Sequence, residues 1–227
     1  MRPALALPSL AAPILLGLVG LAQAADTTDD VFDLDALDVR ITEKLPYLVI
    51  RHEGRPVTLM RYQDPGHTID PPYNQTARPC PPFCIQPMHM PEGVETIGEL
   101  ELIDYLRRVA GGDEGVLVID SRTAEWTAQG TIPGSVNIPY THLDPATAAP
   151  AKVADLLQLE FGVARRDGLW SFNGAKTLVL FCNGIWCPQS SANIKTLVRY
   201  GYPVHKLKWY RGGMQDWLTA GLTTVTP

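Results

Sequence analysis

The feature that most restricts how this chain can fold is an apolar run that ends directly on a cysteine. Residues 177–181, Thr-Leu-Val-Leu-Phe, are bounded by glycine-containing turns on both sides, which predicts a buried strand. The stretch from Ser190 to Tyr200 predicts a helix. The sequence therefore places Cys182 in a tight loop between the carboxyl end of a strand and the amino terminus of a helix.

Strands and helices alternate through the carboxyl-terminal part of the chain, residues 94–227. Such alternation predicts an α/β domain with a central, mostly parallel sheet flanked by helices. In these sheets ligands bind outside the carboxyl ends of strands, and Cys182 holds that kind of position. We predict further strands at 115–119, 135–139 and 205–210, and helices at 99–110, 124–129, 153–161 and 214–220.

Residues 25–93 have a different character and form an amino-terminal extension. Two strands are predicted at 47–52 and 56–63, joined by a turn at Gly54. Because a lone hairpin is marginally stable in water, we expect it to pack on the larger domain. A loop-rich stretch with many prolines and two cysteines follows, from Asp64 to Pro91.

The first 24 residues have the pattern of a secretory signal peptide. A short basic start is followed by an apolar centre and by Ala22-Gln-Ala24, which predicts cleavage after Ala24 and export to a periplasm. The apolar run is too short to span a bilayer, so no membrane insertion is expected. The net charge of −5 and the lack of a basic tract argue against nucleic acid as a partner.

Two chemical roles are open for Cys182 on geometry alone. Backbone N–H groups and the helix dipole at such a position stabilise an anion and favour a nucleophilic thiolate. The alternative is a structural cysteine held in a disulfide.

The four cysteines form two local pairs, Cys80/Cys84 and Cys182/Cys187. Four thiols allow three disulfide connectivities, and the sequence does not choose among them. Disulfides are typical of exported proteins, and a bridge from the first pair toward the second is one of the alternatives. The thiols, thioethers and His89 between Cys80 and Met90 would also suit Cu(I), although C-x3-C is a weak metal motif and we expect no metal site.

Three segments, in this order along the chain, resemble the signature segments of the rhodanese family. Residues 118–126, with Asp120-Ser-Arg122, are similar to its Asp-x-Arg strand and short helix. Residues 130–139, Gly-Thr-Ile-Pro-Gly-Ser-Val-Asn-Ile-Pro, and residues 212–222 are similar to two further segments. Together they flank the Cys182 loop, and the resemblance covers residues 94 to 227.

The resemblance implies a rhodanese-like fold and sulfurtransferase chemistry. Cys182 would attack a sulfane-sulfur donor, carry the sulfur as a persulfide and pass it to a thiol acceptor, with no cofactor. A periplasmic redox protein is a further expected partner. The candidate substrate-binding residues are Asn183, Gly184, Ile185, Trp186, Gln189, Ser190, Arg122 and Arg211.

Two features of the loop modify what the resemblance implies. No Arg or Lys lies between Cys182 and Ser191, whereas family loops usually carry a cation for an anionic donor. Arg122, Arg211 or Lys195 could supply it, although for Arg122 we favour a structural pairing with Asp120 or Glu125. Cys187 in the same loop could act as a resolving thiol or form a structural disulfide.

Three functional hypotheses follow from these patterns. The leading one is an exported rhodanese-like sulfurtransferase or persulfide carrier that uses Cys182. The second is a non-catalytic binding module whose cysteines are all in disulfides. The third is a dithiol redox or copper-handling protein. For Gln189 and Ser190 the sequence also offers a simpler role, that of capping the helix that follows.

Overall fold

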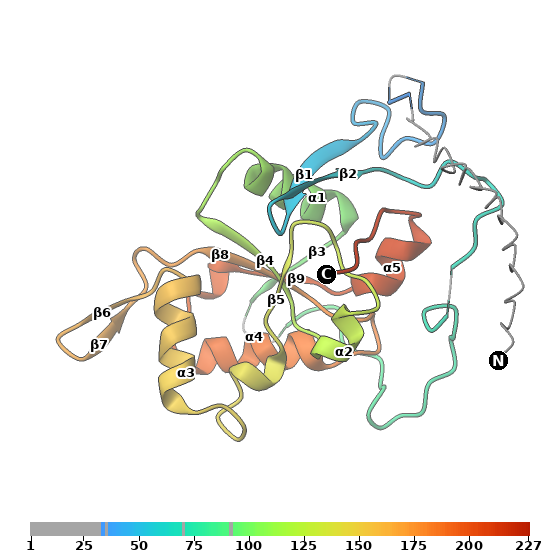
Figure 1. Ribbon diagram of the computed structural model, residues 1–227. Coiled ribbons are helices and arrows are strands. Elements are labelled where there is room, and N and C mark those ends of the chain that lie inside the picture. Colours follow the sequence, from blue (N-terminus) through green and yellow to red (C-terminus); the bar gives the residue numbers. More distant parts are fainter. Residues whose placement is uncertain (1–32, 35, 70, 91–92) are drawn as a thin grey trace, which may run out of the picture. The chain divides into compact units, whose positions relative to one another are not determined.

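The computed structural model describes residues 33–34, 36–69, 71–90 and 93–227. The chain divides into two units, residues 1–33 and 34–227, and the account below concerns the second. The predicted signal peptide, residues 1–24, lies outside the described residues. Within the second unit a central sheet is flanked by helices, as the alternating pattern predicts (Figure 1).

Five parallel strands form the central sheet in the order β3-β9-β8-β4-β5. The strand that precedes Cys182, β8, is the middle one and pairs with β4 on one side and β9 on the other. A five-stranded parallel sheet confirms the predicted fold class. The strands are β3 (Glu95–Ile97), β4 (Val116–Asp120), β5 (Val136–Asn137), β8 (Thr177–Phe181) and β9 (Leu207–Tyr210).

Both faces of the sheet are buried, which explains the continuous apolar run of β8. Leu178 and Leu180 lie in a core with side chains of the helix after the loop, whereas Val179 and Phe181 lie in a second core with the helix after β3. Successive side chains of a strand point to opposite faces, so a strand covered on both sides needs apolar residues throughout.

The helices agree with the predicted ones to within a few residues. They are α1 (Glu99–Ala110), α2 (Ala124–Thr127), α3 (Pro150–Asp155), α4 (Gln189–Arg199) and α5 (Gly213–Thr219). A π-helical turn, Leu156–Glu160, continues α3, and short 3-10 turns lie at Tyr140–His142 and Val204–Lys206. At the start of α1 the Glu101 carboxylate accepts a hydrogen bond from the Gly98 N–H at 3.0 Å, which satisfies a donor that the helix leaves free.

The predicted hairpin consists of β1 (Leu48–His52) and β2 (Arg55–Leu59). It packs on the domain, because Ile50 and Leu59 are buried in the same core as α1 and α5. The prediction that the second strand continues to Gln63 was wrong. Beyond Leu59 the backbone turns to the carboxyl-terminal segment instead, where the Tyr62 N–H donates to the Gly221 carbonyl at 2.7 Å.

Three short strands were not predicted. The edge strand β3 has three residues, and the hairpin β6 (Ala164–Arg166) with β7 (Leu169–Ser171) has strands of three residues each. Segments this short show too little alternation to separate a strand from a loop.

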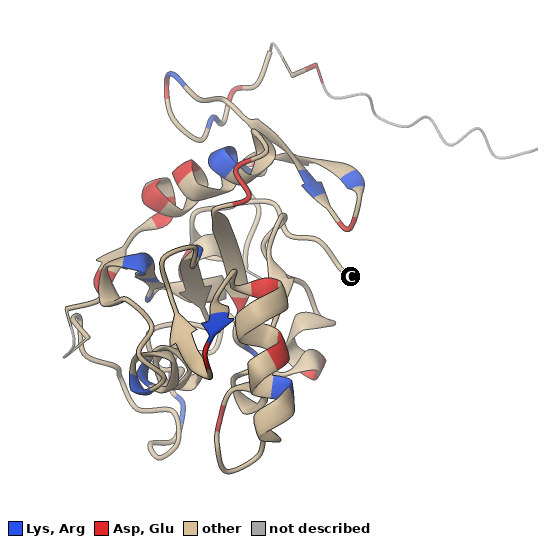
Figure 2. Cartoon of the chain, turned by 90° about the vertical axis from the view of Figure 1, so that its left-hand side faces the viewer, with Lys and Arg blue, Asp and Glu red and all other residues tan. Residues whose placement is uncertain are grey.

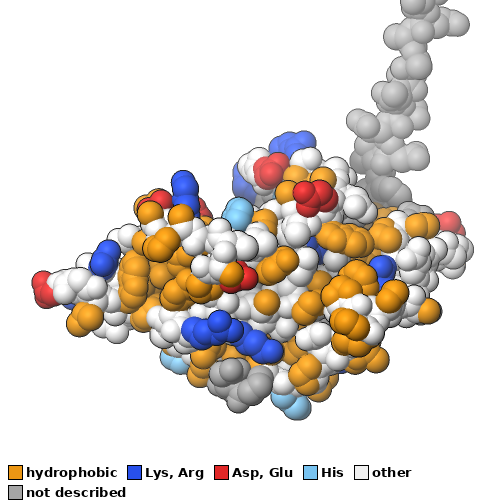
Figure 3. All heavy atoms as spheres, turned by 90° about the horizontal axis from the view of Figure 1, so that it is seen from below, with side chains coloured by type: hydrophobic (Ala, Val, Ile, Leu, Met, Phe, Trp, Pro, Cys, Tyr) orange, Lys and Arg blue, Asp and Glu red, His pale blue; other side chains and the backbone are white. Residues whose placement is uncertain are grey.

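The surface carries both signs of charge. In the view of Figure 2 the acidic and the basic residues are interspersed along the chain. Figure 3 shows apolar side chains gathered on another face, where polar and basic side chains interrupt them. No helix among the described residues is long and apolar enough to cross a membrane.

Candidate functional site

Cys182 lies in the loop between β8 and α4, as predicted. Two backbone hydrogen bonds join helix α5 to this loop. The Met214 N–H donates to the Cys182 carbonyl at 2.9 Å and the Gln215 N–H to the Asn183 carbonyl at 3.0 Å. Gly213 makes the close approach possible. Its φ is +58°, and a Cβ there would collide with the carbonyl oxygen of Cys182.

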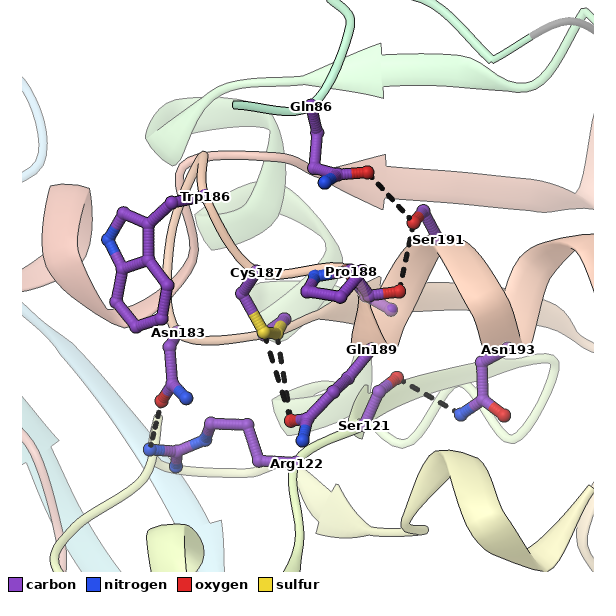
Figure 4. Close-up of a disulfide and its surroundings, with 12 residues drawn as sticks. Gln86, Ser121, Arg122, Asn183, Trp186, Cys187, Pro188, Gln189, Ser191 and Asn193 are labelled. Atoms are coloured by element: carbon purple, nitrogen blue, oxygen red, sulfur yellow. Dashed lines mark hydrogen bonds between the residues drawn. A yellow bond between two sulfur atoms is a disulfide. The ribbon is translucent and has the colours of Figure 1, made fainter. Parts of the chain in front are cut away.

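A disulfide joins Cys182 to Cys187, with 6.2 Å between their Cα atoms. Both cysteines are buried, with exposed fractions of 2% and 3%. Figure 4 shows the Gln189 side chain directed at the pair, and its Oε1 lies 3.8 Å from each sulfur. In the disulfide neither sulfur carries a hydrogen, so this is a contact; a reduced thiol at the same place could donate to Gln189.

The loop is covered by residues 73–90, which we call the cover segment. Trp186 is 6% exposed and clusters with Cys182 and Cys187. The Phe83 ring meets the Trp186 ring edge to face at 5.4 Å, and the Arg78 guanidinium lies 4.0 Å above the same indole. Trp186 thus closes the loop over the sulfur atoms, and the cover segment packs on Trp186.

Hydrogen bonds hold the cover segment at both ends. The Gln86 N–H donates to the Ile185 carbonyl at 2.8 Å, and Arg211 donates to the Gln86 carbonyl at 2.6 Å. Near the other end, Gln215 donates to the Tyr73 carbonyl at 3.0 Å and accepts from the Trp186 indole N–H at 2.8 Å. Arg211 therefore anchors the cover segment.

Arg122 is fully buried and forms an ion pair with Asp120, with Nε 2.8 Å from Oδ1. It also donates to the Tyr73 hydroxyl at 2.6 Å and to Oδ1 of Asn183 at 3.4 Å. Burial acts to lower the pKa of Arg122, but Asp120 and Tyr73 together outweigh that effect and the pKa lies above its ordinary value. Burial raises the pKa of Tyr73, although Arg122 acts in the opposite direction. Arg122 is thus a permanent cation held by an internal network.

The predicted capping role of the first residues of α4 was wrong. No side chain caps this helix, whose N-cap residue is Pro188. Ser190 instead accepts a hydrogen bond from the Trp209 indole N–H at 3.0 Å, and Gln189 faces the sulfur atoms. Gly184 packs under Gln215, whose Oε1 would lie 3.0 Å from an added Cβ.

A comparison with protein-family models identifies the family of this domain. Residues 103–220, which hold the Cys182 loop and the strands on either side of it, match the model described as "Rhodanese-like domain". The chain belongs to the rhodanese-like family. This confirms the resemblance seen in the sequence, and it supports a sulfurtransferase-type function in general terms.

Several solved structures are similar to the rhodanese-like chain. A protein from Bacillus halodurans is 18% identical with a TM-score of 0.41, and the match covers 58% of this chain and 76% of that one. A rhodanese-related protein from Thermoplasma volcanium is 20% identical with a TM-score of 0.37, over 59% and 99% of the two chains. A thiosulfate sulfurtransferase from Pseudomonas aeruginosa is 17% identical with a TM-score of 0.39, over 58% and 20%. The search of curated proteins gave no match.

The predicted site residues of the rhodanese-like domain do come together, but most of them hold the loop and its cover. Asn183, Ile185 and Trp186 bind residues of the cover segment or α5, while Gln189 contacts the sulfur atoms. Arg211 lies against the cover segment. No group of three or more His, Cys, Asp or Glu residues that could hold a metal occurs within the described ranges.

None of the residues that cover the site was among the predicted site residues. Tyr73, Arg78, Phe83 and Gln86 come from the extension, which no motif marks. Aromatic residues in a proline-rich stretch, next to a cysteine pair, were the one available signal. Cys80 and Cys84 in that stretch form the second disulfide, with a Cα–Cα distance of 4.7 Å.

Proposed function

We propose that this protein is a periplasmic sulfurtransferase or persulfide carrier in which Cys182 accepts sulfane sulfur and Cys187 acts as the resolving thiol. The observation that carries the proposal is the position of Cys182 at the carboxyl end of the middle strand of a rhodanese-like domain, paired with a second cysteine of the same loop.

The first step needs Cys182 as a thiolate. The thiolate attacks the sulfane sulfur of a donor; a new S–S bond forms on Cys182, the donor's own S–S bond breaks, and the rest of the donor leaves with the electron pair. The loop supports an anion there: among the described residues, the backbone N–H groups of Gly184, Ile185 and Trp186 donate to no protein group. These donors are free for a persulfide anion.

The second step has two routes. An external thiolate can attack the outer sulfur and leave Cys182 as a thiolate again. Alternatively, the Cys187 thiolate attacks the Cys182 sulfur, which forms the Cys182–Cys187 disulfide and releases the outer sulfur as sulfide. The second route ends in the disulfide that the structure contains. A dithiol must then reduce this disulfide before the next turnover.

Intact and peptide mass spectrometry tests this proposal directly. Reduced Cys187→Ser treated with thiosulfate or glutathione persulfide should gain the mass of one sulfur atom on the peptide that contains Cys182, whereas the reduced wild type should release sulfide and end in the Cys182–Cys187 disulfide. Cys182→Ser should abolish that gain and sulfur transfer together, whereas Cys187→Ser should keep the persulfide and release no sulfide without an added thiol. Wild-type transfer by Cys182→Ser would refute the proposal.

Export is a separate part of the proposal. It is supported by the signal-peptide pattern of residues 1–24. Expression with this segment in a Gram-negative host should yield a periplasmic protein whose first residue is Ala25. An intact amino terminus in the cytoplasmic fraction would contradict it.

A second candidate function rests on the pairing of all four cysteines, which leaves no free thiol in the structure. Such a chain could be a non-catalytic binding module. Thiol titration separates the two: the module predicts that Cys182 stays unreactive after treatment with a protein dithiol, while the sulfurtransferase predicts one reactive thiol at Cys182 and one at Cys187.

A further inference from the structure

The two disulfides of this protein differ sharply in exposure. Cys80 is exposed and Cys84 half-buried, on the cover segment, whereas Cys182 and Cys187 are 2% and 3% exposed beneath Trp186. Thiol–disulfide exchange requires a thiolate to reach a sulfur atom directly. A protein reductant can therefore reach the outer disulfide, Cys80–Cys84, but not the inner one, Cys182–Cys187.

The outer disulfide is nevertheless fixed against the inner loop. Phe83, the neighbour of Cys84, packs on the cluster of Cys182, Trp186 and Cys187. Two residues beyond Cys84, the Gln86 N–H binds the Ile185 carbonyl. Cys84 thus lies between two contacts to the loop that holds the inner disulfide.

A pocket of about 580 Å³ lies between the outer disulfide and the outer side of the inner loop. Cys80 and Cys84 line it from the cover segment, and Ile185 and Trp186 line it from the inner loop. Arg78 lies in the same pocket, where its guanidinium favours the thiolate form of a reduced cysteine nearby. The pocket therefore places a cation, an accessible disulfide and the lid of the inner site together.

We propose that Cys80–Cys84 is a second redox-active pair, which accepts electrons from an external protein dithiol and passes them to Cys182–Cys187. The proposal rests on the proposed function in one respect: the inner pair has to be reduced before Cys182 can take up sulfur. It assigns the extension a role in catalysis, that of reducing the buried site.

The electron transfer runs through three exchanges. An external dithiol reduces Cys80–Cys84 to two thiols and is itself oxidised to a disulfide. The Cys84 thiolate then attacks Cys187, which forms a Cys84–Cys187 bond, breaks the Cys182–Cys187 bond and releases Cys182 as a thiolate. Finally the Cys80 thiolate attacks Cys84, which restores Cys80–Cys84 and releases Cys187. Two electrons and two protons have moved from the external dithiol to the inner pair.

This path needs one local rearrangement. The Cys84 sulfur has to take the place of the Phe83 ring over the inner loop, and adjacent Cα atoms are about 3.8 Å apart. Because Phe83 and Cys84 are neighbours in the chain, the cover segment has to slide along the inner loop for this exchange. The half-buried Phe83 and the buried Trp186 are the side chains that have to move aside.

Trapping the mixed disulfide tests the path. In Cys80→Ser/Cys182→Ser only Cys84 and Cys187 remain, and mild oxidation should join them in a disulfide that non-reducing peptide mass spectrometry detects. Cys80→Ser/Cys187→Ser is the matched control, in which Cys84 and Cys182 should pair less. If Cys84 and Cys187 both stay alkylatable and unlinked after oxidation, the path is wrong.

Reduction rates test the role. With a thioredoxin as the reductant, the inner disulfide of Cys80→Ser/Cys84→Ser should be reduced at least tenfold more slowly than that of the wild type. A small phosphine should reduce the inner disulfide of this variant at least as fast as that of the wild type. That result would show that the substitutions have not made the cover segment close more tightly over the inner loop. An unchanged or faster rate with thioredoxin would overturn the proposal. Neither experiment measures sulfur transfer. The electron path can therefore be refuted while the persulfide on Cys182 is still observed, and the path can be confirmed while no persulfide forms.

Discussion

Tyr73 donates its hydroxyl hydrogen to Oδ1 of Asn183 at 2.9 Å, and this bond ties the amino-terminal extension to the residue that follows Cys182. The same hydroxyl accepts a hydrogen bond from Arg122. The extension is therefore part of the site, because one of its side chains completes the polar network beneath the cysteine loop.

Removing that hydroxyl should loosen the site. In Tyr73→Phe, the Arg122 guanidinium and the Asn183 amide lose a buried partner, which costs about 1–3 kcal/mol of unfolding free energy. Urea unfolding measures the loss. Tyr62→Phe is the control, because Tyr62 is 41% exposed and its loss should be near zero. If Tyr73→Phe and Tyr62→Phe lower the free energy of unfolding equally, the buried Tyr73 hydroxyl contributes nothing to stability.

The buried ion pair should dominate the stability of the region between β4 and β5. Arg122→Met leaves Asp120 buried without its cation, and breaking such a pair costs about 3–5 kcal/mol. Thermal or urea unfolding measures this. Arg107→Met breaks an exposed pair with Asp104 and should cost about 1 kcal/mol or less. A small loss for Arg122→Met would mean that the network reorganises around Asp120.

Stability should decrease as the pH falls below the ordinary pKa of histidine. Burial lowers the pKa of His52 from 6.5, with Glu53 acting against this and Arg55 acting with it. Its Nδ1 accepts a hydrogen bond from the Gly134 N–H at 3.2 Å, which protonation would break. Below pH 6.5 the unfolded chain binds the proton more readily than the folded one, so the folded state loses stability.

Unfolding midpoints measured at pH 7.5 and at pH 5.5 check this effect. His52→Gln should reduce the difference between the two values. The exposed His205 provides the control, and His205→Gln should leave the difference as it is in the wild type. If His52→Gln keeps the full difference, another group causes it.

The close approach of α5 to the cysteine loop should not tolerate a side chain. In Gly213→Ala the new Cβ would meet the Cys182 carbonyl and lie 2.8 Å from the Gly184 nitrogen, so the loop has to shift. We expect sulfur transfer by the reduced protein to fall at least tenfold. Gly112 also has a positive φ, +87°, but nothing lies within 4 Å of an added Cβ, so Gly112→Ala should cost about 1–2 kcal/mol in stability and leave transfer unchanged.

The sequence alone determined the architecture of the rhodanese-like domain and the place of Cys182 within it. The apolar run of β8, the amphipathic helix α1 and the strand–loop–helix order are local patterns, and local patterns follow from backbone periodicity and burial. The Asp120–Arg122 pair is local as well, since the two residues are two positions apart.

Only the tertiary structure decided how the site is closed and which cysteines pair. Tyr73 and Asn183 are 110 positions apart, and Gln86 reaches Ile185 from a segment without helix or strand periodicity. Such contacts depend on where the whole sheet brings distant segments together, which no local pattern records. The same reason explains why the sequence left three disulfide connectivities open, while the fold places Cys80 beside Cys84 on the cover and Cys182 beside Cys187 beneath it.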